Sequence, residues 1–153
     1  MMKLKLTTLT FVVLALFSCG GGDSASKENA LTEAVENASP ADPMSDKGVG
    51  PVTSVEIAAD VDATMAAEGE KIFTAKCTAC HKIGKKYIGP DLTGVTKIQS
   101  PEWIMNMILN PEVMIVQNET AKQLLMKFTA PMANQNLTKE EARSVYEFFR
   151  TKN

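Results

Sequence analysis

Residues 76–84 read KCTACHKIG, and this stretch places Cys77, Cys80 and His81 within five positions. The whole chain of 153 residues has three cysteines and one histidine, and the third cysteine, Cys19, lies near the amino terminus. Sulfur and imidazole groups are therefore scarce in this protein, and most of them occur together. The clustering indicates that these three residues build one site.

The spacing of the cluster is the attachment pattern of a c-type haem, in which Cys-x-x-Cys is followed directly by His. Two intervening residues let one helical turn set both sulfur atoms along a single edge of the macrocycle. The thiols then add to the two vinyl groups as thioethers, and the next residue places its imidazole under the iron. The pattern predicts one covalent haem c, bound through Cys77 and Cys80, with His81 as an iron ligand.

Three other interpretations of the cluster fit the sequence less well. A structural zinc site needs four ligands, and after these three residues the chain offers no other histidine and only Cys19 as a further thiol. A thioredoxin-like redox pair expects a strand before the motif and a βαβ context, which the surrounding sequence lacks. A chance match inside a helix would leave the long loop at residues 82–99 unexplained.

The amino terminus has the pattern of a targeting segment. Lys3 and Lys5 precede a short apolar run, residues 9–17, which is too short to span a bilayer. The following LFSCGGG resembles a bacterial lipoprotein processing box, so we expect residues 1–18 to be a lipoprotein signal peptide and Cys19 to be lipidated. The alternative is a plain secreted protein with an unpaired cysteine.

The segment that follows, residues 19–61, is acidic and poor in apolar residues. From Gly20 to Val61 it has eight acidic residues, two lysines and no aromatic residue. Such a stretch cannot bury enough apolar surface to fold alone. We therefore expect a lipid-anchored flexible tether over residues 19–61 and one folded domain over residues 62–153.

The pattern of residues 62–153 is helical. Apolar residues recur at helical spacing over about 65–75, from 101 to before Pro111, behind Asn118, and after Thr138. Ser100 followed by Pro101 is a typical helix start, and Thr138 with Glu141 is a capping box. No alternating apolar run of strand length occurs. The predicted fold class is all-α: about four helices with long loops wrapped around a covalent haem.

Residues 62–153 resemble a class I mono-haem bacterial cytochrome c along their whole length. Gly69 and Phe73 resemble the positions of the family's first helix that pack against the last helix, where Tyr146 and Phe149 would be the partners. The stretch GPDLTGV, residues 89–95, resembles the family loop whose proline carbonyl accepts a hydrogen bond from the haem-binding histidine. The resemblance thus implies that the Pro90 carbonyl orients His81.

The sixth iron ligand is expected to be a methionine sulfur, because the only histidine is already used. Most methionines of the domain lie in apolar helical stripes, where methionine normally packs. Met132 instead follows Pro131 in an Asn-rich segment, before the helix that starts behind Thr138. The family pattern of a ligand methionine before a Leu-Thr-x-x-Glu helix start resembles this segment. Met132 is the predicted ligand, and Met114 is the second candidate.

Histidine and methionine on opposite faces leave iron no open position, which favours electron transfer. We expect a single-electron carrier, not an enzyme, tethered to a membrane in the periplasm-facing bacterial envelope through the lipid on Cys19. Its partners would be redox donor and acceptor proteins, and the charge balance gives no reason to expect nucleic acid. The alternatives are a haem enzyme or small-ligand sensor with a labile sixth ligand, and a dedicated haem subunit of a larger oxidoreductase complex.

Two further features have a functional and an ordinary interpretation. Lys82, Lys85 and Lys86 lie beside the attachment motif and form either a basic rim for an acidic redox partner or an ordinary solvated loop. Trp103 is expected in the core, although the family also uses tryptophan to contact a haem propionate.

Overall fold

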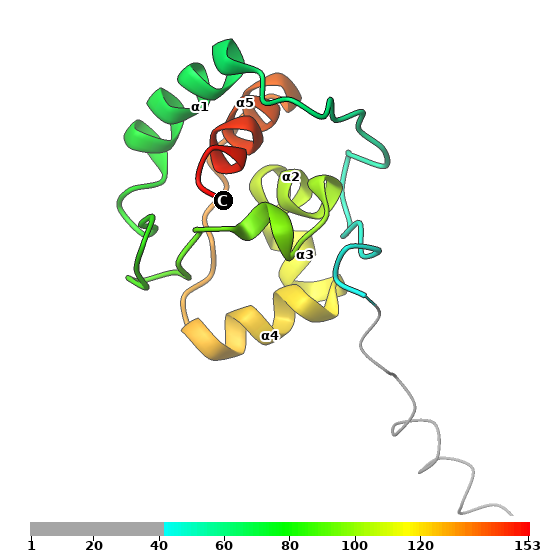
Figure 1. Cartoon of the computed structure of the whole chain (residues 1–153). Coiled ribbons are helices and arrows are strands. Elements are labelled where there is room, and N and C mark those ends of the chain that lie inside the picture. Colours follow the sequence, from blue (N-terminus) through cyan, green and yellow to red (C-terminus); the bar gives the residue numbers. More distant parts are fainter. Residues whose placement is uncertain (1–41) are drawn as a thin grey trace, which may run out of the picture. The chain divides into compact units, whose positions relative to one another are not determined.

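The computed structural model describes residues 42–153, and Figure 1 shows how their helices are arranged, with α1 beside α5. The predictions for the signal peptide, for Cys19 and for the tether up to residue 41 lie outside the described residues. None of the described helices is long and apolar enough to cross a membrane. The described elements are α1 (Ala63–Lys76), the short 3₁₀ helix η1 (Val95–Lys97), α2 (Pro101–Leu109), α3 (Pro111–Gln117), α4 (Glu119–Phe128) and α5 (Lys139–Arg150).

The all-α prediction is confirmed, because residues 42–153 form five α-helices and no β-sheet beyond a single bridge between Lys82 and Asp91. The helix starts follow the predicted signals. The Ser100 hydroxyl accepts a hydrogen bond from the Trp103 N–H with proline at the first helical position, and Thr138 and Glu141 cap each other's backbone N–H groups.

Helix α3 is the α-helix that the sequence did not predict. The sequence predicts a connection over its seven residues, because Pro111 reads as a stop for the preceding helix. Proline does end α2, but its fixed φ also suits the first position of a new helix. One residue therefore closes α2 and opens α3.

Helices α1 and α5 cross at close range, as the family resemblance implied for Gly69. A Cβ atom at Gly69 would run into the backbone carbonyl of Ser144. Beside this contact the Phe73 ring packs on Phe148 and Phe149, with ring centroids 5.3 and 5.7 Å apart. Phe149 is thus a ring partner of Phe73 as implied, and Phe148 is a second one. The Tyr146 ring is buried on the same helix and lies beside the Arg143 guanidinium. The crossing holds the end of α1, where the haem motif begins.

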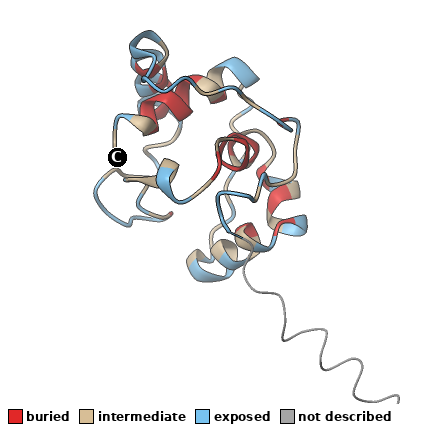
Figure 2. Cartoon of the chain, turned by 45° about the vertical axis from the view of Figure 1, so that its right-hand side comes forward, coloured by how far each residue is buried: buried red, intermediate tan, exposed pale blue. Residues whose placement is uncertain are grey.

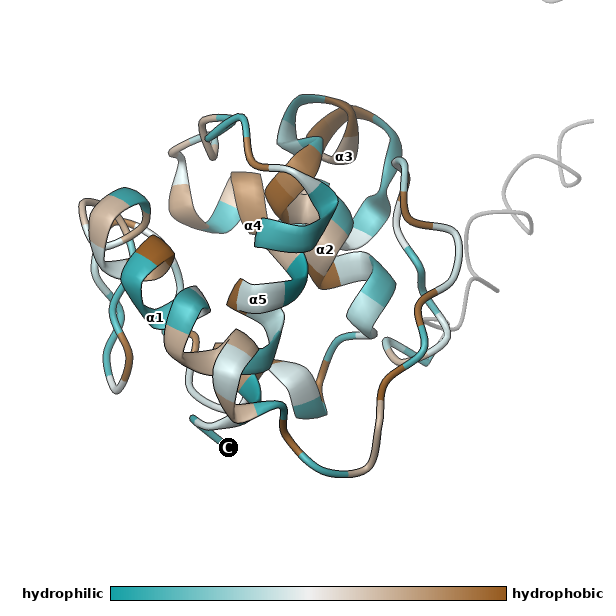
Figure 3. Cartoon of the chain, turned by 90° about the horizontal axis from the view of Figure 1, so that it is seen from above, coloured by the Kyte–Doolittle hydropathy of each residue, from teal (hydrophilic) through white to brown (hydrophobic). Residues whose placement is uncertain are grey.

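The core lies between α5, α2 and the inner face of α1, which carry most of the buried residues (Figure 2). Hydrophobic residues also gather on α2 and α3 (Figure 3). Glu147 is a charged exception, with its side chain fully buried on α5. It forms ion pairs with Arg143 and Arg150, so the buried charge is compensated.

Residues 42–61 form an extended segment that packs along the helices, and we call it the N-terminal strap. Val52 is buried, and its backbone N–H and C=O bond to the side-chain amide of Asn106 on α2. Farther along, Arg143 donates to the Glu56 carbonyl, and Arg150 donates to carbonyls of residues 58–60. The prediction of a flexible tether is therefore wrong for residues 42–61, and the folded part begins earlier than residue 62.

The physical reason for this correction is that helix side chains bind the strap through its backbone. The prediction of a tether rested on the small number of apolar side chains available for burial. The strap indeed has only one buried hydrophobic residue, Val52. Its carbonyl and N–H groups are satisfied by amide and guanidinium groups from residues more than fifty positions away. Such long-range bonds leave no local signal in the strap's own sequence.

Candidate functional site

The site begins where α1 ends. Cys77 is the C-terminal cap of α1, and its carbonyl accepts hydrogen bonds from the N–H groups of Cys80 (3.1 Å) and His81 (2.9 Å). This turn brings both cysteines and the histidine to one place, as the motif predicted. Neither thiol forms a disulfide, and Cys77 is half-buried while Cys80 is exposed.

The two thiols differ in their surroundings. Burial raises the pKa of the Cys77 thiol to about 11, and the charge of Lys76 partly opposes this shift. The Cys77 sulfur therefore stays protonated at neutral pH and faces an apolar environment, in which a thioether would be well accommodated.

The imidazole of His81 is oriented by the loop that follows it. Its Nδ1 atom lies 3.4 Å from the carbonyl oxygen of Pro90, the contact that the family resemblance implied. Burial lowers the pKa of His81, and the bond to Pro90 partly opposes this shift. A neutral ring that donates Nδ1–H to Pro90 presents the Nε2 lone pair, which is the form that a metal ligand needs.

Gly89 is required beside this ring. A Cβ atom there would lie 2.5 Å from Cε1 of His81, closer than real Cβ contacts allow. The Gly89 N–H also donates to the Cys80 carbonyl (2.9 Å), which folds the loop back onto the attachment motif. Glycine thus lets the backbone lie flat against the imidazole.

Asp91 fastens the same loop. Its Oδ1 atom accepts hydrogen bonds from the N–H groups of Thr93 and Gly84, both at 2.9 Å, and from the Thr93 hydroxyl. These bonds, the Thr93 amide first, lower the pKa of Asp91, so the carboxylate stays ionised at neutral pH. The long loop at residues 82–99 is therefore held in a defined conformation beside the site by its own hydrogen bonds.

Two neighbouring cavities of about 200 and 70 Å³ open beside His81. Because they share six lining residues, we treat them as one space and call it the haem crevice. Cys80 lines the larger cavity and Cys77 the smaller one. The shared lining is His81, Leu92, Val95, Trp103, Met107 and Met132.

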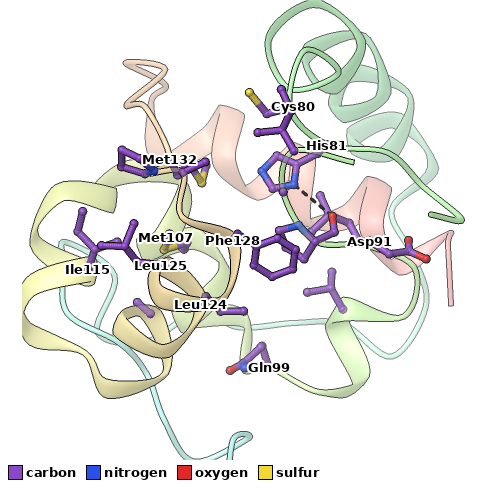
Figure 4. A pocket seen from close by; sticks show the side chains of 18 of the residues that line it. Cys80, His81, Asp91, Gln99, Met107, Ile115, Leu124, Leu125, Phe128 and Met132 are labelled. Carbon is purple, nitrogen blue, oxygen red and sulfur yellow. Dashed lines mark hydrogen bonds between the residues drawn. The ribbon is translucent and has the colours of Figure 1, made fainter. Parts of the chain in front are cut away.

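The haem crevice fits a haem. Its walls are mostly apolar, from Leu92 and Val95 on one side to Leu124 and Leu125 of α4, as a hydrophobic macrocycle requires. The cysteine pair lies at its border, with one sulfur beside each cavity. The His81 ring and the Met132 side chain approach the drawn cavity from different sides (Figure 4).

The lining of the crevice distinguishes the two methionines proposed as the sixth ligand. Met132 lines both cavities, as a ligand to haem iron must, whereas Met114 lines neither. Met114 is fully buried, and its sulfur accepts a hydrogen bond from the Val49 N–H of the strap (3.0 Å). Met107 on α2 also lines both cavities. The sequence interpretation treated Met107 as packing material and missed its place in the crevice wall.

Trp103 is part of the wall and of the core, as expected. Its ring lines both cavities, and its Nε1–H donates to Oδ1 of Asn118 at 3.0 Å. Because that donor is already engaged, Trp103 does not supply a hydrogen bond to a propionate.

Three lysines lie over aromatic rings near the crevice. The Lys86 ammonium lies 4.9 Å from the ring centroid of Phe128, which lines the larger cavity, and Lys127 lies over the same ring. Lys82 lies over the Tyr87 ring at 5.2 Å and donates to the Thr78 carbonyl. We call Lys82, Lys86 and Lys127 the lysine rim. The sequence pointed to Lys82, Lys85 and Lys86. The exposed Lys85 makes no such ring contact among the described residues, whereas Lys127 joins the set only through the fold.

Comparison with known proteins agrees with this geometry. Residues 66–152, more than half of the chain, match the family model described as cytochrome c. Cytochrome c from Rhodothermus marinus is 40% identical, with a TM-score of 0.65 over 67% of this chain and 88% of that one. An engineered form of the Rhodothermus protein bound to a carbene intermediate is also 40% identical, with a TM-score of 0.63 over 67% and 88%. No curated protein gives a significant match.

The family match covers the attachment motif, the loop after it and helices α2 to α5. Both cysteines of the Cys-x-x-Cys-His motif are present at the border of the crevice. The chain therefore belongs to the cytochrome c family, whose members carry a haem c bound covalently through two cysteines, here Cys77 and Cys80.

Proposed function

We propose that this protein is a membrane-tethered carrier of single electrons, with His81 and Met132 as the two axial ligands of its haem iron. Membership of the cytochrome c family indicates haem-based electron transfer. The observation that carries the finer proposal is that His81 and Met132 line the same apolar crevice beside the two cysteines. The haem supplies the Fe(III)/Fe(II) couple, and the residues around it determine how that couple behaves.

His81 is proposed to bind iron through Nε2. The Pro90 carbonyl accepts its Nδ1–H and selects the tautomer, while Gly89 limits rotation of the ring. A hydrogen bond to the far nitrogen makes the imidazole a more basic ligand. Pro90 would thus influence the iron through its hydrogen bond to His81.

Met132 is proposed to bind iron through its sulfur. It lies between α4 and α5 in a segment without regular structure, and its side chain lines both cavities of the crevice. A soft thioether stabilises Fe(II), and an apolar crevice disfavours the extra positive charge of Fe(III). Both effects raise the reduction potential relative to a solvated haem.

The partners are proposed to be redox proteins with an acidic docking surface. The lysine rim lies over the rings of Tyr87 and Phe128, of which Phe128 lines the larger cavity, and Tyr87 and Ile88 are exposed beside it. Positive charge around an apolar contact area steers an acidic partner toward the haem edge.

The location is proposed from the amino terminus, which lies outside the described residues. The sequence of residues 1–18 and the cysteine at position 19 support a lipid anchor in the bacterial envelope, with the domain facing the periplasm. Tethering raises the effective concentration of the carrier near membrane-bound donors and acceptors.

A second candidate function is binding or conversion of a small molecule at the iron. It is favoured by the engineered Rhodothermus relative that holds a carbene intermediate. In this chain it would require Met132 to leave the iron. A dedicated haem subunit of a larger oxidoreductase complex would use the same ligands as a free carrier.

Absorption spectroscopy tests these proposals. Methionine-ligated ferric haem has a weak near-infrared charge-transfer band, which we expect in the matured protein and in Met114→Ala and Met107→Leu, but not in Met132→Ala. A band that persists in Met132→Ala would overturn the ligand assignment. Carbon monoxide binding to the unmodified ferrous protein would favour the small-molecule function over the carrier.

A further inference from the structure

Gln99 carries a buried side-chain atom that has no hydrogen-bond partner among the described residues. Within residues 42–153, its Oε1 is the one buried side-chain nitrogen or oxygen in this condition. An unpaired buried amide oxygen is costly, and native structures seldom keep one without a reason. Gln99 lines the larger cavity of the haem crevice, so the partner it lacks would lie inside that cavity.

The position of Gln99 relative to the attachment motif is informative. Figure 4 shows Gln99 at the opposite end of the cavity from Cys80. In haem, the two vinyl groups and the two propionates occupy opposite edges of the macrocycle. When Cys77 and Cys80 hold the vinyl edge, the propionate edge extends away from them, toward the end of the cavity that contains Gln99.

The other polar side chains of the crevice are already engaged. The Trp103 Nε1–H donates to Asn118, and the Gln135 amide donates to the Ala133 carbonyl. Asp91 also lines the larger cavity, but it is an anion whose Oδ1 serves the loop, and it would repel a propionate. Gln135 lines the smaller cavity, so among the polar side chains of the larger cavity, apart from Cys80 and His81, Gln99 is the one that makes no hydrogen bond within the described residues.

We infer that the side-chain amide of Gln99 is a hydrogen-bond partner of a haem propionate. An ionised propionate accepts hydrogen bonds, and an amide offers two N–H donors after a half-turn of its terminal group. Oxygen and nitrogen of such an amide are assigned from their partners, and the propionate supplies the partner that decides this orientation.

The backbone holds Gln99 in place for this role. Its N–H donates to the carbonyl of Val95, the first residue of η1 (3.1 Å), and the next residue, Ser100, caps α2. Gln99 is therefore fixed between two helix ends, and only its side chain is adjustable. It acts as a positioning residue for the cofactor, and this inference rests on the covalent haem and not on the identity of the sixth ligand.

Infrared redox difference spectroscopy on the matured full-length protein, with ¹³C-labelled haem propionates, tests this inference. We expect Gln99→Met to shift a labelled propionate band, whereas Gln123→Met, an exposed glutamine of α4, leaves the bands unchanged. Gln99→Glu should lower the reduction potential at neutral pH, because an added negative charge near the propionate edge stabilises Fe(III).

Two outcomes would overturn the inference. One is a set of labelled bands that is the same in Gln99→Met as in the unmodified protein. The other is a potential in Gln99→Glu equal to that of Gln123→Glu. The near-infrared methionine band and the pyridine haemochrome spectrum, recorded on the same samples, report haem attachment and ligation separately. Failure of the propionate contact is thereby distinguished from failure of the electron-carrier proposal.

Discussion

The side-chain amide of Asn118 donates to both carboxylate oxygens of Asp46, each at 2.9 Å, and so joins the N-terminal strap to the start of α4. The same Asn118 accepts a hydrogen bond from the indole of Trp103 through its Oδ1. A strap residue is thereby connected, through one intermediate side chain, to the wall of the haem crevice.

Asp46→Ala tests this connection. We expect it to lower the free energy of unfolding by about 1–3 kcal/mol, because the Asn118 amide loses a charged acceptor in a partly buried position. Urea denaturation of the matured protein measures the effect. Asp42→Ala is the matched control, since Asp42 makes only an exposed local turn. Equal unfolding free energies for the two variants would show that the Asp46 contact is not stabilising.

Glu147→Gln tests the buried ion-pair group. The fully buried carboxylate pairs with Arg143 and Arg150, and the two guanidinium groups hold strap carbonyls. Removing the charge should destabilise the fold by about 3 kcal/mol. It should also expose the strap to trypsin at Lys47 under native conditions.

The control for Glu147→Gln is Glu112→Gln, because Glu112 is exposed on α3. Cleavage at Lys47 that is no faster in Glu147→Gln than in Glu112→Gln would mean that the arginines hold the strap without help from Glu147.

Gly89→Ala tests the close approach to His81. The added methyl group would force the imidazole or the loop to move, which should cost about 1–3 kcal/mol of stability and alter the haem spectrum. Gly84→Ala provides the comparison. Gly84 has a positive φ of 87° but open space around its Cα, so its substitution strains the backbone without touching the ring. Identical spectral changes in the two variants would contradict the role given to Gly89.

Asp91→Asn tests the pH dependence of the loop. Hydrogen bonds lower the pKa of Asp91 in the folded protein below its ordinary value of 3.8, so its ionised form stabilises the fold. This stabilisation is complete above that ordinary value and is lost as the pH falls through the lower folded pKa. We therefore expect Asp91→Asn to be less stable than the unmodified protein at pH 7, with the difference shrinking in strong acid. Denaturation curves of both proteins at pH 7 and in strong acid measure this difference in unfolding free energy. A difference that does not change with pH would contradict the stabilising role of the ionised Asp91.

Lys86→Glu tests the lysine rim. Reversing a charge at the crevice mouth should slow electron exchange with an anionic reagent and speed exchange with a cationic one, by roughly several-fold at low ionic strength. Stopped-flow kinetics measure the two rates, with hexacyanoferrate as the anionic reagent and hexaammineruthenium as the cationic one. Lys71→Glu, on the exposed face of α1, is the control. Equal effects of Lys71→Glu and Lys86→Glu would show that only net charge matters.

Local patterns predicted the parts of this protein that local interactions build. The attachment motif spans five residues, and the helix caps at Ser100 and Thr138 act within one turn, so both could be inferred from sequence. The position of Met132 beside the crevice was predicted from its place between two helices. Its role as a ligand stays a prediction.

Features built by long-range contacts were not predictable in the same way. The strap is bound by side chains more than fifty residues away, whereas its acidic composition predicted a flexible tether. Gln99 and Met107 carry no distinguishing sequence signal, because their significance depends on the shape of the crevice. Pro111 illustrates a different limit, since proline ends one helix and starts another by the same restriction of φ.

The strap also determines where a mechanical load on the amino terminus would be borne. A pull on the chain before residue 42 would first meet the contacts of Asp46 with Asn118, then those of Asn106, and then the arginines of α5. Only after these had yielded would the force reach α1 and the cysteines at its end. The contacts of the strap would therefore bear any tension carried by the preceding chain before that tension reached the covalent haem attachment.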